Sequence, residues 1–120
     1  MRTMAELERV VRELNQVRDL AQRYAETVRH HFGARLKRAR LFGSAARGDW
    51  TRESDIDVLI LLDQVTSEDF DYLIVTATHM GVLDSGWLLQ PLPMTEEEFN
   101  KLKSRERRLA LDIEHEGIEL

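Results

Sequence analysis

The stretch "LFGSAARGDWTRESDIDVLILL", residues 41–62, decides the fold of this 120-residue chain. It holds a Gly-Ser turn and, further on, an Asp-x-Asp pair, Asp55 and Asp57, at the start of an apolar run. Beyond Asp57 both faces of the expected strand are apolar, which is typical of a strand in the middle of a covered sheet. Residues two apart in a strand share a face, so both carboxylates point to one spot. The segment therefore predicts a covered sheet with two acidic groups at one end of a central strand.

Two carboxylates held together repel each other, by roughly 1 kcal/mol in water and several-fold more where the dielectric constant is lower. A hard divalent cation removes this repulsion, and Mg²⁺ is commonly held by one or two carboxylates together with phosphate oxygens and water. The alternative is that Asp55 and Asp57 only end a strand and cap a turn. The spacing by itself leaves both interpretations open.

The Gly-Ser turn favours the metal interpretation. Gly43 followed by Ser44 lets backbone amides and a hydroxyl approach phosphate oxygens closely. If "SAARG", residues 44–48, makes a helical turn, its first amides also favour an anion, and Arg47 adds a fixed positive charge one turn later. A Gly-Ser pair alone is found in many ordinary turns, so the evidence lies in its combination with the acidic pair.

The combination of "GSAARG" at 43–48 with "SDID" at 54–57 resembles the signature of the DNA polymerase β-like nucleotidyltransferase superfamily, in particular its small bacterial branch, the minimal nucleotidyltransferases. The resemblance implies one set of nucleotide-binding residues and one set of metal-binding, catalytic residues. The nucleotide-binding set is Gly43, Ser44, Arg47 and Gly48. The catalytic set, which would bind Mg²⁺, is Asp55 and Asp57.

The resemblance also implies an activity and partners. Such an enzyme would transfer a nucleoside monophosphate, AMP from ATP in the favoured case, to a hydroxyl of a protein or other acceptor. Minimal nucleotidyltransferases often serve as antitoxins of a helical HEPN-domain toxin, so the resemblance implies a toxin-antitoxin role and a HEPN-type partner.

One part of the family pattern is missing. The family usually has a third metal-binding carboxylate on a later strand, here expected in "GWLLQPLPM", residues 86–94, which contains none. Gln90 is its only polar side chain, and Asp84, just before the strand, is the alternative. The resemblance implies that loss of this carboxylate affects activation of the attacking hydroxyl more than nucleotide binding. The second functional hypothesis is therefore a catalytically weak or inactive nucleotide-binding interaction module.

The apolar spacing predicts one domain over residues 1–120, of class α+β (mixed α/β), with a small mixed sheet covered by helices, and the resemblance implies that it has the nucleotidyltransferase fold. Its parts are an N-terminal helix (1–33), a catalytic-type core (34–94) and C-terminal helices (95–120). The expected helices are a long one over 5–32 and shorter ones over 66–80, from 95 onward and over 105–116, followed by a free tail 118–120. The expected strands are 36–42, 55–62 and 86–94. The last strand is expected near an edge of the sheet because its two prolines cannot donate hydrogen bonds. The long helix either packs on its own domain or forms a homodimer, and its periodicity allows both.

Composition narrows the classes of ligand. There is no cysteine, so a metal must be held by oxygen or imidazole. The net charge of −5 combines a basic first third with an acidic remainder, which suits a divalent cation and argues against nucleic acid as the partner. The absence of a long apolar run or a signal peptide argues against a membrane and predicts a cytoplasmic protein.

Overall fold

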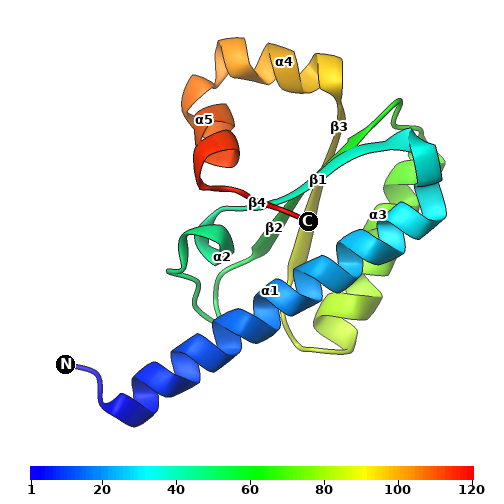
Figure 1. The fold of residues 1–120 in the computed structure, drawn as a ribbon. Helices are drawn as coiled ribbons and strands as arrows, with labels where there is room; N and C mark the ends of the chain where they lie inside the picture. The colour runs from blue at the N-terminus through cyan, green and yellow to red at the C-terminus, as the bar shows by residue number, and fades with distance from the viewer.

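A computed structural model describes residues 1–120, and its four strands form a mixed sheet with helices on both faces (Figure 1). The strand order is β3-β2-β1-β4, with β2 and β3 parallel and β1 antiparallel to both β2 and β4. The strands are β1 (Leu36–Phe42), β2 (Ile56–Leu62), β3 (Leu89–Thr95) and β4 (Ile118–Glu119). The helices are α1 (Met4–Phe32), α2 (Ser44–Arg47), α3 (Ser67–Thr78), α4 (Glu96–Arg105) and α5 (Arg107–Glu116). The predicted α+β class, the long first helix and the edge position of the proline-containing strand are confirmed.

β2 is the central strand of a three-layer arrangement. Val58, Ile60 and Leu62 belong to the core cluster shared with α1 and α3, while Leu59 and Leu61 belong to a second cluster shared with α4 and α5. Figure 1 shows the same division, with α1 and α3 on one side of the sheet and α4 and α5 on the other. All five side chains are nearly or fully buried, as the two apolar faces of this segment predict.

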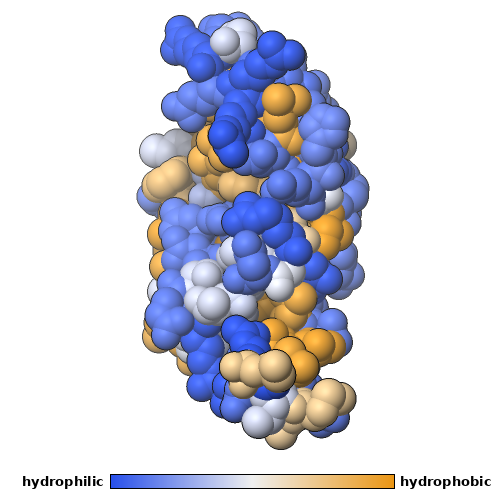
Figure 2. All heavy atoms as spheres, turned by 90° about the vertical axis from the view of Figure 1, so that its left-hand side faces the viewer, coloured by the Kyte–Doolittle hydropathy of each residue, from blue (hydrophilic) through white to orange (hydrophobic).

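α1 packs on its own domain over its second half only. Its buried residues begin at Val17 and continue to Phe32, whereas Met4, Leu7 and Val11 in the first half are exposed. Figure 2 shows hydrophobic atoms gathered at the lower end of the molecule, where Figure 1 places the start of α1. Packing on its own domain is thus observed for part of the helix, and the other part leaves an apolar stripe exposed. None of the helices combines the length and apolar character needed to cross a bilayer.

The C-terminal segment differs from the prediction of a free tail. Ile118–Glu119 forms β4 against β1, and the Leu120 amide donates to the Ala39 carbonyl over 3.0 Å. Arg40 fixes this segment by donating to the carbonyl oxygens of Ile113, Glu114 and Gly117 and to the Glu119 carboxylate. A two-residue strand has no periodicity of its own, and its partner is about 80 positions away, so local patterns do not reveal it.

The helix expected over residues 66–80 also ends differently. Regular α-helix stops at Thr78, and a π-helical turn, His79–Leu83, follows. A Cβ at Gly81 would lie 2.7 Å from the Trp87 carbonyl oxygen, so the turn and the loop before β3 touch only because this residue is glycine. The last helix likewise begins at Arg107 rather than Arg105, because the backbone of Glu106 is not helical and separates α4 from α5.

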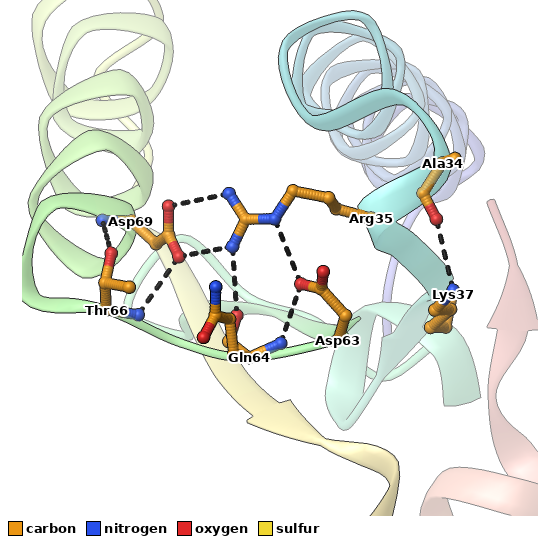
Figure 3. Close-up of polar contacts among 7 residues, drawn as sticks. All are labelled: Ala34, Arg35, Lys37, Asp63, Gln64, Thr66 and Asp69. Carbon is orange, nitrogen blue, oxygen red and sulfur yellow. Dashed lines mark hydrogen bonds and ion pairs between the residues drawn. The ribbon is translucent and has the colours of Figure 1, made fainter.

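Arg35 ties the far end of β2 to the start of α3 (Figure 3). Its guanidinium donates to both carboxylate oxygens of Asp69, at 3.1 and 2.6 Å, to Asp63 at 3.0 Å and to the Gln64 carbonyl. Asp69 also completes a capping box with Thr66. This contact with Arg35 holds the pKa of the buried Asp69 carboxyl well below its usual value. The cluster lies at the end of β2 opposite Asp57, so it supports the sheet rather than the candidate site.

Candidate functional site

The candidate site lies where the first residues of β2 meet the end of β1 and the start of β3. Asp57 is the second residue of β2, and its register partners are Phe42 on β1 and Gln90 on β3. Asp55 precedes the strand and is exposed, whereas Asp57 is half-buried. Paired residues on neighbouring strands point to the same face of a sheet. Gln90 therefore stands beside Asp57 on the face covered by α4 and α5.

The Gly-Ser turn packs directly against the second carboxylate. Gly43 has φ +73°, a conformation that favours glycine, and a Cβ at this position would lie 2.5 Å from Asp57 Oδ2. Ser44 then begins α2, so the "SAARG" segment does make a helical turn, and Gly48 ends it with φ +96°. The fold thus brings Gly43, Ser44 and Asp57 together across 14 positions of sequence.

The electrostatics of this corner favour a cation. Burial, and after it the neighbouring Asp55 carboxylate, raises the pKa of Asp57, while Arg47 acts in the opposite direction. The ionised form of Asp57 is therefore held at a cost. A divalent cation would lower that cost, and two carboxylates with an adjacent amide oxygen on Gln90 are a donor set of the oxygen type that Mg²⁺ takes.

Neither candidate for the third position supplies a third acidic ligand. The chain holds no group of three His, Asp or Glu side chains placed to bind one metal ion. Asp84 is exposed and follows the π-helical turn, so it does not complete such a group with Asp55 and Asp57. The neutral Gln90 is the residue that the register places beside the acidic pair.

Arg47 lies at the end of α2 and links it to the C-terminal layer. Its guanidinium is 3.5 Å from Asp49 and 3.5 Å from Glu116 at the end of α5. Both pairs are long and partly exposed, so they leave the guanidinium available to another anion. Arg47 is thus close to the turn, as the sequence predicts, and is held there by an unpredicted contact with α5.

Two features of the site have no local sequence signal. Arg18 on α1 donates to the carbonyl oxygens of Ala45 and Ala46 in α2, 27 and 28 positions away. Trp50, in the loop between the two motifs, is buried against Trp87 with a ring-centroid distance of 5.5 Å. Contacts over such separations can be read only from the folded chain.

A model of the nucleotidyltransferase domain family matches residues 21–116. The chain belongs to the nucleotidyltransferase family. The matched part of this nucleotidyltransferase contains every site residue that the sequence predicts. It begins in the middle of α1, so the exposed first half of that helix and Arg18 lie outside it.

Two individual proteins support the assignment. "Putative protein adenylyltransferase MJ0604" of Methanocaldococcus jannaschii is 41% identical over 78 residues, which cover 65% of this chain and 73% of that protein. The crystal structure of a "putative nucleotidyltransferase" from Sulfolobus solfataricus matches 77% of this chain and 78% of its own with a TM-score of 0.52 and 23% identity. The first is a relative in sequence, and the second shows the fold. Together they confirm the resemblance that the two motifs indicate and the enzyme class, nucleotidyltransferase.

Proposed function

We propose that this nucleotidyltransferase transfers AMP from ATP, with Mg²⁺, to a hydroxyl of a protein acceptor and releases pyrophosphate. The observation that carries the proposal is the contact of Gly43 with Asp57, which puts a phosphate-binding type of turn against an acidic pair. The 41% identical relative, named as a protein adenylyltransferase, supports the choice of nucleotide and acceptor.

Each site residue then has a task. The amides after Gly43 and the Ser44 hydroxyl hold the triphosphate, while Arg47 places positive charge beside it. Asp55 and Asp57 would hold Mg²⁺, which would supply positive charge beside the phosphate oxygens. With the triphosphate fixed, the acceptor oxygen forms a bond to the α-phosphorus opposite the leaving pyrophosphate and loses its proton to solvent. This orientation is the main contribution of the protein.

A second candidate function is favoured by one specific observation, the neutral Gln90 beside Asp57. In that case the chain binds ATP and a partner protein without turnover. Both functions require Mg²⁺-dependent ATP binding, which titration calorimetry measures with the wild type and Asp57→Asn. Absence of binding by the wild type contradicts both functions.

Transfer separates the two functions. ATP labelled in the α-phosphate is incubated with Mg²⁺, the protein and proteins that co-purify with it. We expect AMP-sized label on a protein acceptor, and none with Asp55→Asn. ATP binding without transfer to any acceptor supports the interaction module instead.

The partner is a finer proposal. The family resemblance implies a HEPN-domain toxin as acceptor and an antitoxin role, in the cytoplasm where ATP is available. Its test is co-expression with such a protein, in which wild-type chain relieves growth arrest and Asp55→Asn does not. Relief by both forms supports neutralisation by binding alone.

A homodimer through α1 is supported by the order of charges on its exposed groove, which encloses about 880 Å³. Glu8, Arg12, Asp19 and Arg23 line this groove. In an antiparallel pair of α1 helices, Glu8 faces Arg23 of the second copy and Arg12 faces Asp19, so each position meets its opposite charge. Light scattering should show a dimer that Arg12→Glu weakens and Arg12→Glu with Asp19→Arg restores; a monomer at every concentration excludes it.

A further inference from the structure

Helix α2, which carries Ser44, has the length of a single turn and cannot be stable by itself. Nucleation of a helix costs more than one turn of hydrogen bonds returns, and the four residues of α2 lie between two glycines with positive φ. Its last carbonyl oxygens also have no partner further along the helix. The orientation of the turn must therefore be fixed by contacts from outside it.

Arg18 supplies the polar part of those contacts. Its Nε donates to the Ala45 carbonyl and its Nη2 to the Ala46 carbonyl, both over 3.0 Å. The same Nη2 lies about 4.0 Å from the position that a Cβ on Gly48 would take. Ala45 and Ala46 are themselves buried, so this half-buried guanidinium spans the whole inner side of the turn.

The geometry requires a guanidinium rather than any positive charge. Two successive carbonyl oxygens are bonded by two nitrogens of one planar fork, which is rigid and keeps its charge at all accessible pH values. A lysine ammonium at this place is a single point on a flexible stem. It can reach one carbonyl at a time and does not fix the angle of the turn.

We propose that Arg18 is a positioning residue of the nucleotide site, which holds α2 so that Ser44 and the following amides face the triphosphate. This inference rests on the proposed function, because it assigns the turn to the triphosphate. It places part of the nucleotide site on α1, outside both sequence motifs and outside the matched residues 21–116.

The test compares Arg18→Met, Arg18→Lys and the control Arg9→Met. Arg9 lies on the same helix, is exposed, and belongs neither to the nucleotide site nor to the charged groove of α1. Calorimetry measures the dissociation constant of ATP with Mg²⁺, and hydrogen exchange with mass spectrometry follows the amides of residues 46–49. We expect Arg18→Met to weaken ATP binding roughly tenfold. The amides of Arg47 and Gly48, which bond Gly43 and Ser44, should exchange faster while those of Val17–Phe32 keep their protection. Arg18→Lys should recover little of the affinity, and Arg9→Met should behave as the wild type.

Three results overturn the inference. One is wild-type ATP affinity and wild-type exchange of residues 46–49 in Arg18→Met. Another is full recovery by Arg18→Lys, which would show that charge alone suffices. The third is faster exchange throughout the core of either variant, which would make Arg18 a general structural residue. Failure of the wild type to bind ATP contradicts the proposed function instead, and exchange then still reports whether Arg18 holds α2.

Discussion

Replacement of Gln90 by glutamate should convert the neutral third position into an acidic one. Gln90 is the register partner of Asp57 on the parallel strand, and the backbones of neighbouring strands lie about 4.8 Å apart. The new carboxylate is therefore expected at a similar distance from that of Asp57. Two unit charges about 5 Å apart repel by ~0.8 kcal/mol in water and by ~3 kcal/mol at an effective dielectric constant of about 20. Because Gln90 is exposed and Asp57 half-buried, we expect Gln90→Glu to lose roughly 1–2 kcal/mol of stability without metal.

Magnesium should reverse this loss. For a chain of this size, roughly 1–2 kcal/mol corresponds to a fall of about 4–8 °C in Tm, which calorimetric or fluorescence melting in EDTA detects. Added Mg²⁺ should raise the Tm of Gln90→Glu more than that of the wild type, since three carboxylates bind the cation more tightly than two. If a third acidic ligand is what turnover lacks, AMP transfer should also rise at least about tenfold, within the range that metal and base assistance supply.

The matched control is Gln90→Met, which keeps the side-chain length and adds no charge. Its melting should not depend on Mg²⁺ more than that of the wild type. The reasoning is refuted if Gln90→Glu and Gln90→Met melt together in EDTA and respond equally to Mg²⁺. Such a result would mean that the side chain of residue 90 points away from the acidic pair.

Three further substitutions test the structure in other ways. Arg35→Met should lower the free energy of unfolding in urea at pH 7 by about 2–4 kcal/mol, because Asp69 stays buried without its partner. The loss should shrink below about pH 4. A carboxyl whose pKa is lowered by folding contributes stability above its unfolded-state pKa, and this stability is lost as the pH falls through its folded-state pKa. Gly43→Ala should lower the free energy of unfolding in the same assay by at least about 2 kcal/mol, because the new Cβ would clash with the Asp57 carboxylate. The control Gly33→Ala should lower it by about 1 kcal/mol, because φ is also positive there but nothing lies within 4 Å of the new Cβ. Asp57→Asn should stabilise the metal-free protein at pH 7, because a raised pKa means that ionisation of Asp57 costs stability as the pH rises. Mg²⁺ should no longer raise the Tm of this variant, and equal melting of Asp57→Asn and the wild type in EDTA contradicts the prediction.

Sequence patterns predict those parts of the fold that depend on short-range order. Alternation along β2 is an example, since Leu59 and Leu61 face one core cluster and Val58 and Ile60 the other. The site motif is equally local, because Gly43 and Asp57 lie in one hairpin of antiparallel strands, where β1 leads into the turn and β2 returns. Such features follow from residue periodicity and turn chemistry.

Features that depend on contacts between distant residues cannot be predicted from local sequence patterns. β4 pairs with β1, and Arg40 stabilises this pairing by donating hydrogen bonds to carbonyl oxygens at the end of α5. No repeat or capping residue near Ile118 predicts the pairing. Trp50 lies in the loop between the two motifs and is buried against Trp87, 37 positions away in the sequence. In each case, the contact joins residues that are far apart in the sequence.

The position of α2 shows how such contacts bear on function. The turn that begins with Ser44 lies between the two helical layers: Arg18 holds its inner side from α1, and Glu116 on α5 holds Arg47 from the other. The hydrogen bonds from Arg18 are short and half-buried, whereas the pair of Arg47 with Glu116 is long and exposed. A hydrogen bond from a charged donor contributes about 1.5–3 kcal/mol and an exposed ion pair about 0–1 kcal/mol, so the α1 contact determines where the turn sits. A molecule that displaces α1 would consequently alter nucleotide binding more than one that displaces α5, although neither helix contributes a residue to the two sequence motifs.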